Sequence, residues 1–310
     1  MRSSLCRAAL TAATTGLLGM PLRALLIHAG LFDVPNHRSS HSTPIPRGGG
    51  AAPLTAAALV GAVGPRPSGR TTGAVLGLAA VGLADDVSGH VPALARLGAQ
   101  LVAGGALGTG PGAAFASVGT TGIVNVVNFM DGINGISGGA GAVWGANALT
   151  LAAKPTDELA ILGALVLGGS LGFLPHNAPR ARFFLGDLGS YSLGAAMAAG
   201  VFSRRRLADQ WCVASPLLLY GLDAAHALIH RVRTRQALGV AHRDHVYQRL
   251  VDSGIPHAKV AAFHAGLAAL VALAHHAQSL RWRVLGTTVA SAVYLCAPRL
   301  VGTTEAGRAA

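Results

Sequence analysis

Charged residues are scarce in this chain. Of its 310 residues, 51% are hydrophobic and only 12% are charged, about half the share that is typical of a soluble domain. The mean hydropathy is +0.49. No polar linker of domain-separating length interrupts the apolar runs. The composition therefore argues against soluble domains and favours a single helical membrane bundle.

Cysteine is equally sparse. Cys6, Cys212 and Cys296 lie far apart, each in or beside an apolar segment, and the sequence has no CxxC motif. A disulfide or a zinc site is therefore not expected, and the three residues are interpreted as small core residues.

Acidic residues are few as well. The chain has 12 Asp and Glu against 24 Lys and Arg, which gives a net charge of +12. This excess suits anionic lipid headgroups and phosphate-bearing substrates. The arginines are scattered over short loops, so no nucleic-acid partner is expected.

What is abundant is apolar sequence of membrane-spanning length. The first segment follows Arg2 and Arg7 and has no clear A-x-A cleavage site, so it is interpreted as a transmembrane helix and not as a signal peptide. Several segments are short, and the third and fifth are the least secure, so the expected count is ten or eleven spans. The eleven segments are Leu5–Leu22, Gly48–Gly64, Thr71–Ala84, Ala93–Gly108, Ala113–Val127, Ile136–Ala153, Leu159–Leu174, Gly189–Phe202, Trp211–Ile229, Val260–His276 and Val284–Ala297.

The polar residues divide by the parity of the loops. Loops after odd-numbered spans hold nearly all the Asn, Asp and His, whereas the others are plain connectors. The loops after odd-numbered spans carry slightly more Lys and Arg than the other loops, which favours the cytoplasm for the odd side. We therefore expect one integral membrane domain over residues 1–310. Its cytoplasmic loops lie around residues 23–47, 85–92, 128–135, 175–188 and 230–258.

Two adjacent carboxylates end the third segment. Asp85 and Asp86 are costly at a membrane boundary unless they are paired or bound to a cation. Mg²⁺ commonly takes one or two carboxylates together with substrate phosphates. The alternative is a solvated helix end.

Amides and a carboxylate end the fifth segment. Asn125, Asn128 and Asp131 are spaced three residues apart, which places them on one face of a helix. Asp131-Gly132 and Asn134-Gly135 then break the helix, and such a break at membrane depth must line a cavity. The alternative is an ordinary Asx-Gly turn.

Two further segments suit phosphate binding. Asp187 lies in a Gly-Asp-Leu-Gly-Ser turn, where glycine permits close approach of a ligand. The loop before the second segment carries the side chains of Arg38, His41 and Arg47, which can pair with phosphate, or is simply a basic juxtamembrane loop.

The loop after the ninth segment is basic and rich in hydrogen-bonding groups. Its HxxH spacing is weak evidence for zinc, since no third ligand lies nearby. Before it, Asp223 and His226 are expected to pair with each other or with Arg231 in a structural role. The loop itself carries Arg243, His245, Tyr247 and Gln248.

Together, these loops make the chain resemble the polyprenyl-phosphate N-acetylhexosamine-1-phosphate transferases. These are the glycosyltransferase family 4 membrane enzymes, which include the phospho-N-acetylmuramoyl-pentapeptide transferases. The resemblance runs from about Leu31 to Leu250. The matching segments are DVPNHRSSHSTPIPRGGG, GLADDVSGH, NFMDGINGISGG, PHNAPRARFFLGDLGS and HRDHVYQRL.

The resemblance implies an all-α bundle that transfers a sugar-1-phosphate from a UDP-sugar to undecaprenyl phosphate and releases UMP. It implies dependence on Mg²⁺, with Mn²⁺ as a substitute, and a bacterial inner-membrane location with a cytoplasmic active site. The expected partners are the UDP-sugar, undecaprenyl phosphate and membrane lipids, and a homodimer is one candidate assembly.

It also implies roles for individual residues. Asp187 matches the metal-binding aspartate, Asp86 is expected to help bind the metal, and Asp85 is expected near the lipid phosphate. The expected catalytic residues are Asp85, Asp86, Asp131, Asp187 and His245. The expected substrate-binding residues are Arg38, His41, Arg47, Asn128, Asn134, Asn177, Phe184, Arg243, Tyr247 and Gln248.

Two departures from the family pattern bear on the donor. Tyr247 and Gln248 stand where further histidines are common, and this form resembles a branch that initiates O-antigen or other surface glycans from UDP-linked 6-deoxy-N-acetylhexosamines such as FucNAc or QuiNAc. Asn134 stands where muramoyl-pentapeptide transferases usually have Asp. The alternatives are a polytopic transporter and a catalytically inactive lipid-binding relative.

Overall fold

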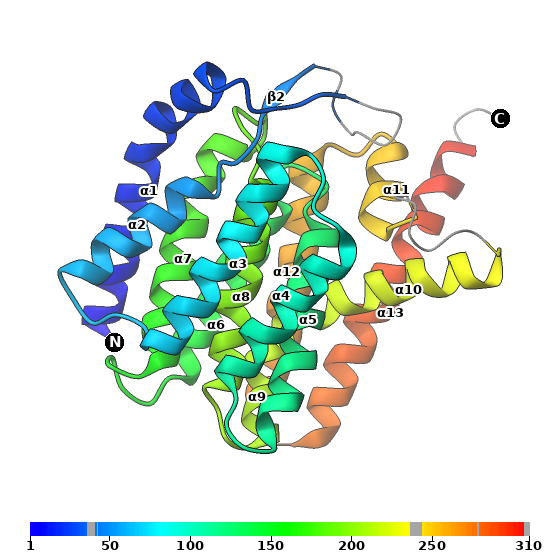
Figure 1. Cartoon of the computed structure of the whole chain (residues 1–310). Coiled ribbons are helices and arrows are strands. Elements are labelled where there is room, and N and C mark those ends of the chain that lie inside the picture. The colour runs from blue at the N-terminus through cyan, green and yellow to red at the C-terminus, as the bar shows by residue number, and fades with distance from the viewer. Residues whose placement is uncertain (36–40, 42, 236–243, 278, 307–310) are drawn as a thin grey trace.

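The structure, a computed structural model, describes residues 1–35, 41, 43–235, 244–277 and 279–306. This part of the chain is almost entirely helical (Figure 1). The one exception to the all-α expectation is a hairpin in which β1 (Phe32–Asp33) pairs antiparallel with β2 (Ile45–Pro46). The helices are α1 (Arg2–His28), α2 (Ala51–Ala62), α3 (Gly69–Ser88), α4 (Ala93–Leu107), α5 (Gly112–Met130), α6 (Ile136–Leu151), α7 (Glu158–Asn177), α8 (Gly186–Phe202), α9 (Leu207–Ala214), η1 (Ser215–Leu217), α10 (Leu218–Arg233), α11 (Val246–Asp252), α12 (His257–His276) and α13 (Leu280–Ala306).

Each of the eleven predicted apolar segments contains helix, and α9, η1 and α10 together form the ninth. The all-helical fold and its multi-pass membrane character are therefore confirmed. The count of ten or eleven spans is not confirmed, because α2, α3, α4, α6 and α8 are not among the helices that are long and apolar enough to cross a membrane. Within the described residues, the helices long and apolar enough to cross a membrane number six: Arg2–His28, Gly112–Met130, Glu158–Asn177, Leu207–Arg233, His257–His276 and Leu280–Val301.

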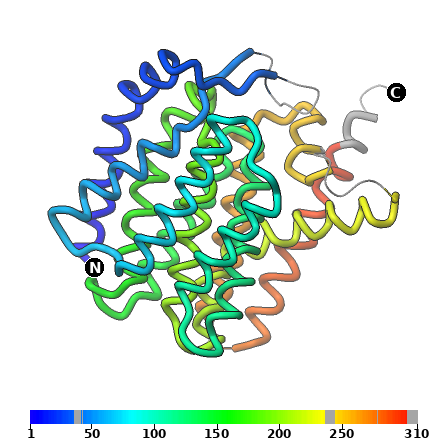
Figure 2. Tube along the Cα trace, in the orientation of Figure 1, coloured from blue at the N-terminus to red at the C-terminus, as the bar shows by residue number. Residues whose placement is uncertain are grey.

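The helices run up and down the bundle, as the trace in Figure 2 shows. Helix α7 packs against α1 and α6, and α8 packs against α3 and α5. Helix α10 differs, because it lies across the direction of the others and extends away from the bundle (Figure 1). The largest core cluster holds the fully buried Trp144, Met197 and Tyr294. This core fixes the framework that carries the loops.

Small residues bring the helix backbones close together, as expected for membrane helices. A Cβ added at Gly82 in α3 would overlap the backbone carbonyl of Asp187, and one added at Gly50 would overlap the backbone of Gly189. Glycine at these positions therefore lets α3 and the chain before α2 lie directly against the beginning of α8.

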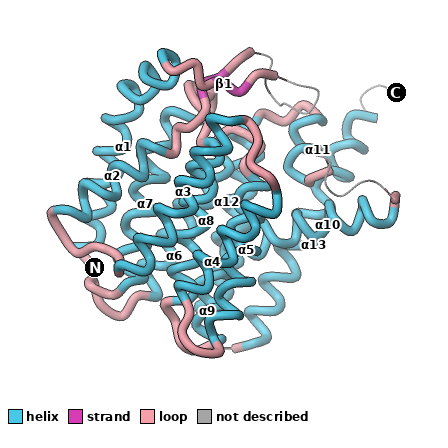
Figure 3. Tube along the Cα trace, viewed as in Figure 1, coloured by secondary structure: helices cyan, strands magenta, loops and turns pink. Residues whose placement is uncertain are grey.

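The loops gather at the two ends of the bundle (Figure 3). At the upper end, as drawn, backbone and side-chain hydrogen bonds join the loops that the sequence predicts on one side. Phe184 N donates to Pro46 O at 2.8 Å, and Gly135 N donates to Asn177 Oδ1 at 2.6 Å. We call the end of the bundle that carries Pro46, Gly135, Asn177 and Phe184 the upper end.

A substitution of Gly82 tests the close contact between α3 and α8. Gly82→Ala should lower the free energy of unfolding by about 1–3 kcal/mol, because the added methyl group forces the two helices apart. Thermal unfolding in detergent measures this effect. Gly77→Ala on the same helix is the control, because a Cβ there meets nothing within 4 Å. Equal effects of the two substitutions would contradict the close contact.

Candidate active site

Asp86 joins the end of α3 to the beginning of α8. Its two carboxylate oxygens accept hydrogen bonds from Asp187 N and Leu188 N, each at 3.0 Å. The first turn of a helix has unpaired N–H groups and a positive dipole end, so a carboxylate stabilises it. The preceding Gly186 has φ +74°, and a Cβ there would lie 2.6 Å from Asp86 Oδ2. Asp86 therefore fixes the position of Asp187.

This contact bears on the predicted metal ligands. The Asp86 side chain is only 1% exposed, and both of its oxygens already accept backbone N–H groups. Its role as a direct metal ligand stays a prediction. Burial is the main cause that raises its pKa.

Asp187 is held from the side by α5. Asn128 Nδ2 donates to Asp187 Oδ1 at 2.7 Å and to Ser190 Oγ at 2.9 Å. Burial, and then the negative charge of Asp86, raise the pKa of Asp187 to about 7. Two carboxylates this close repel each other unless a proton or a cation lies between them. Asp187 is thus the acid whose charge a cation would stabilise.

Asp85 has a cationic partner that the sequence analysis missed. Arg96 Nη1 in α4 donates to Asp85 Oδ2 at 2.9 Å, and Val91 N donates to Asp85 Oδ1 at 2.6 Å. The available signal was a lone arginine near the start of an otherwise apolar helix. The ion pair compensates the charge of Asp85. Its predicted place near a lipid phosphate stays a prediction.

The turn between α5 and α6 holds Asp131. Ser137 Oγ donates to Asp131 Oδ1 at 2.6 Å, and burial raises the pKa of Asp131 to about 6. Gly135, with φ +85°, begins α6. Of the three residues predicted to share one face of a helix, Asn125 bonds elsewhere, because its Nδ2 donates to Gln100 Oε1 at 2.6 Å.

Two predicted amides tie loops together. Asn177 Nδ2 donates to Phe183 O at 3.2 Å, in addition to its bond with Gly135 N. Asn134 Nδ2 donates to Pro179 O at 3.2 Å. Both side chains thus position the turn between α5 and α6 against the loop before α8, and their predicted substrate contacts stay predictions.

The predicted phosphate-binding loop before α2 contacts Asp86 and Phe184. Arg47 Nη2 donates to the backbone oxygen of Asp86 at 2.6 Å. The rings of His41 and Phe184 meet edge to face at 4.9 Å. Arg38 and Arg243 lie outside the described residues.

The predicted site residues nearest the C-terminus, His245, Tyr247 and Gln248, lie at the beginning of α11. His245 N donates to Gln248 Oε1 at 3.4 Å, and Tyr247 OH donates to Phe129 O at 3.2 Å. Tyr247 is buried, and its hydroxyl occupies the space that a side chain at Gly132 would need. These residues therefore contact the turn that carries Asp131.

Part of the chain that carries these acids is similar in sequence to known proteins. The sequence model of glycosyl transferase family 4 matches residues 70–203, from α3 through α8. This range contains Asp85, Asp86, Asp131 and Asp187. This match supports a relationship to glycosyl transferase family 4. His245 lies beyond the matched range.

Three relatives are each similar to part of the chain. It is 32% identical over 116 residues to the decaprenyl-phosphate N-acetylglucosaminephosphotransferase of Mycobacterium leprae. These residues cover 33% of this chain and 29% of the relative. It is 27% identical over 100 residues to the probable undecaprenyl-phosphate N-acetylglucosaminyl 1-phosphate transferase of Bacillus subtilis, with 31% and 28% covered. A phospho-N-acetylmuramoyl-pentapeptide-transferase of Symbiobacterium thermophilum is 51% identical over 51 residues, with 16% and 15% covered. The chain thus matches less than a third of the length of each relative.

The acids of this candidate site fit a hard divalent cation. Among the residues that the structure describes, no three His, Cys, Asp or Glu side chains form a ready cage. Mg²⁺ does not require one, because it keeps several waters and takes one or two carboxylates plus substrate phosphates. Asp187, with its raised pKa beside Asp86, supplies such a carboxylate.

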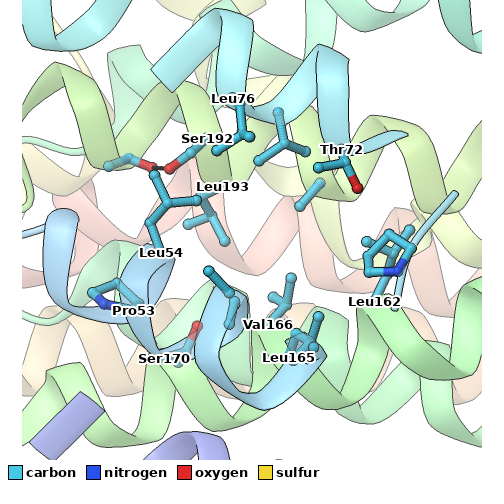
Figure 4. Close-up of a pocket in the computed structure, with 18 of the residues that line it drawn as sticks. Pro53, Leu54, Thr72, Leu76, Leu162, Leu165, Val166, Ser170, Ser192 and Leu193 are labelled. Atoms are coloured by element: carbon cyan, nitrogen blue, oxygen red, sulfur yellow. Dashed lines mark hydrogen bonds between the residues drawn. The ribbon is translucent and has the colours of Figure 1, made fainter. Parts of the chain in front are cut away.

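An apolar groove begins beside the acids. It has a volume of about 350 Å³ and lies between α2, α3, α7 and α8. Ser137, which donates to Asp131, is among its lining residues. Figure 4 shows Leu54 of α2, Leu76 of α3, Leu162, Leu165 and Val166 of α7, and Leu193 of α8 around it. The groove thus joins the acidic site to a wall of hydrocarbon side chains.

The raised pKa of Asp187 gives a pH-dependent prediction. A cation binds the ionised carboxylate, so protons compete with Mg²⁺ below a pH of about 7. Adding Mg²⁺ should therefore raise the thermal midpoint more at pH 8 than at pH 6. Asp187→Asn should abolish this Mg²⁺ effect while raising the midpoint of the metal-free protein at pH 8, because it removes a buried charge.

Asp209→Asn is the matched control. Asp209 is exposed in the first turn of α9, away from the acids, so this variant should respond to Mg²⁺ like the original protein. An equal Mg²⁺ effect at both pH values, or one that persists in Asp187→Asn, would contradict the assignment.

Proposed function

We propose that this protein transfers a sugar-1-phosphate from a UDP-sugar to undecaprenyl phosphate at the upper end of the bundle. The single observation that carries the proposal is the crowding of Asp86 and Asp187 between α3 and α8, within a match to glycosyl transferase family 4. The relatives named above are polyprenyl-phosphate sugar-phosphate transferases, which supports the same reaction class.

In the proposed reaction, an oxygen of the lipid phosphate attacks the β-phosphorus of the UDP-sugar. The bond from that phosphorus to the bridging oxygen breaks, and UMP leaves with the electron pair. A bound Mg²⁺ would neutralise charge on the pyrophosphate and on the leaving UMP. The attacking phosphate needs little help from a base, because its second pKa is about 6.

The side chains of the protein take positioning and electrostatic roles. Asp187 holds the cation and Asn128 orients Asp187, while Asp86 fixes the first turn of α8 and helps to hold the cation. Asp85, paired with Arg96, lies near the lipid phosphate.

The remaining predicted residues bind substrate in this proposal. Arg47 attracts phosphate, and Asp131 lies towards the nucleotide-sugar. We assign donor recognition to the two loops that Asn134 and Asn177 hold together. Tyr247 contacts the turn between α5 and α6, and we assign His41, Phe184, Gln248 and His245 to the same substrate-binding role.

The proposed setting is a bacterial inner membrane with the upper end in the cytoplasm, where nucleotide-sugars are found. The proposed donor is a UDP-linked N-acetylhexosamine or 6-deoxy-N-acetylhexosamine, and the product initiates a surface glycan. A homodimer stays a prediction.

A transporter is the competing class. Its ion ligands should lie near the middle of the spans, whereas Asp86, Asp131 and Asp187 lie at helix ends. An inactive lipid-binding relative would not need the carboxylates beside Asp187.

Product formation tests the proposal. Purified protein with Mg²⁺, undecaprenyl phosphate and a panel of UDP-sugars should release UMP and form a lipid-linked sugar detectable by mass. Asp187→Asn should abolish both, because the cation loses its principal carboxylate. UMP release that needs no lipid phosphate, or near-normal turnover in Asp187→Asn, would refute the proposal.

We assign the polyprenyl tail to the apolar groove, because Ser137 places its lining beside Asp131. Ala58 of α2 is exposed and lines the groove. Ala58→Phe should raise the KM for undecaprenyl phosphate by about tenfold, equivalent to ~1.4 kcal/mol of binding, because the ring occupies space for the tail. The KM for the UDP-sugar should not change.

Thr55→Phe adds the same ring to an exposed position of α2 that is not among the groove-lining residues. It should leave both constants unchanged. If the two variants raise the KM for undecaprenyl phosphate equally, the tail lies elsewhere.

A further inference from the structure

Asp223 is a fully buried carboxylate in α10, outside the cluster around Asp187. A carboxylate within an apolar bundle is costly unless it has partners, and such residues are often functional. From the sequence, Asp223 is expected to pair with His226 or Arg231 in a structural role. The structure gives it partners on α11 and α13.

Both oxygens of Asp223 are engaged. Oδ1 accepts from Val246 N at 2.9 Å and lies 3.3 Å from His245 Nδ1. Oδ2 accepts from Tyr294 OH at 2.7 Å. One carboxylate therefore holds the beginning of α11, with its His245 ring, against α10 and α13.

The His245 ring is also fixed on the side of the catalytic loops. It stacks with the ring of Tyr247 at a centroid distance of 5.4 Å. The Tyr247 hydroxyl donates to Phe129 O, two residues before Asp131. Because Tyr247 occupies the space above Gly132, a shift of α11 would disturb the turn between α5 and α6.

We propose that Asp223 is a positioning residue that orients His245 for the transfer reaction. A carboxylate beside one nitrogen of an imidazole fixes its tautomer and the direction of its ring. Of the two ring nitrogens, Nδ1 is the one that lies 3.3 Å from Asp223 Oδ1, and we assign Nε2 to a substrate phosphate. This inference rests on the proposed function.

The alternative is that Asp223 only holds three helices together. Tyr294 separates the two roles, because its hydroxyl contacts the oxygen of Asp223 that faces away from His245. Tyr294→Phe removes a hydrogen bond to the same carboxylate but leaves the charge beside His245. Asp223→Asn removes that charge while keeping the volume and an acceptor for Val246 N.

The test compares Asp223→Asn, His245→Asn, the double variant and Tyr294→Phe in the full-length protein. Asp223→Asn should lower kcat by at least about tenfold and leave both KM values within about twofold. The double variant should be no slower than His245→Asn alone, because residues that act through one another are not additive. Tyr294→Phe should lower the thermal midpoint but keep kcat within about twofold.

Two outcomes would overturn the proposal. The losses from Asp223→Asn and His245→Asn could multiply in the double variant, or Tyr294→Phe could lose as much kcat as Asp223→Asn. Either result would mean that Asp223 acts by holding the helices together.

A measurement without substrate keeps this test separate from the proposed function. Side-chain ¹⁵N spectra of histidine-labelled protein, with His245→Asn to assign the signal, should report the Nδ1–H tautomer for His245. Asp223→Asn should change that signal and Tyr294→Phe should not. If the protein forms no lipid-linked product, the transferase proposal fails, while these spectra still decide whether Asp223 orients His245. An unchanged signal in Asp223→Asn would refute the positioning role.

Discussion

The first turn of α8 has backbone N–H groups that no carbonyl of its own helix can accept, and the Asp86 carboxylate accepts two of them. This contact joins the end of α3 to the beginning of α8 at a point where Gly82 permits backbone contact. It sets the distance between Asp86 and Asp187. Without it, Asp187 would lie on a helix end with no fixed place relative to α3.

The same contact explains the electrostatics of the site. Asp86 stabilises the positive end of α8, but its charge and the surrounding apolar bundle raise the pKa of Asp187. Arg96 compensates Asp85. The cluster thus has one compensated acid, one acid bound to a helix end, and one acid whose ionised form needs a cation. This unequal distribution is consistent with the proposed site for a metal ion and phosphates.

A second buried carboxylate, Asp223, organises the C-terminal part of the molecule. Asp223 of α10 accepts hydrogen bonds from α11 and α13. Tyr247 of α11 in turn donates to Phe129 O, next to the turn that holds Asp131. The turn between α5 and α6 therefore lies between two carboxylate-centred clusters. Asn177 fixes it from the α8 side and Tyr247 from the α11 side, so the turn that carries Asp131 is held from both directions.

The sequence by itself determined which segments are helices and that the polar loops divide by parity, because run length and helix breaks are local properties of the chain. It also located Asp85, Asp86, Asp131 and Asp187 at helix ends. It did not determine the hairpin, α11 or the number of spans.

Only the tertiary structure decided which partner each polar side chain has. Asp85 pairs with Arg96, Asn125 bonds Gln100, Asn177 joins two loops, and Asp223 bonds Tyr294 and not a neighbour on α10. Such partners lie on other helices, and their meeting depends on where glycines let those helices cross. Periodicity within one segment carries no information about that crossing.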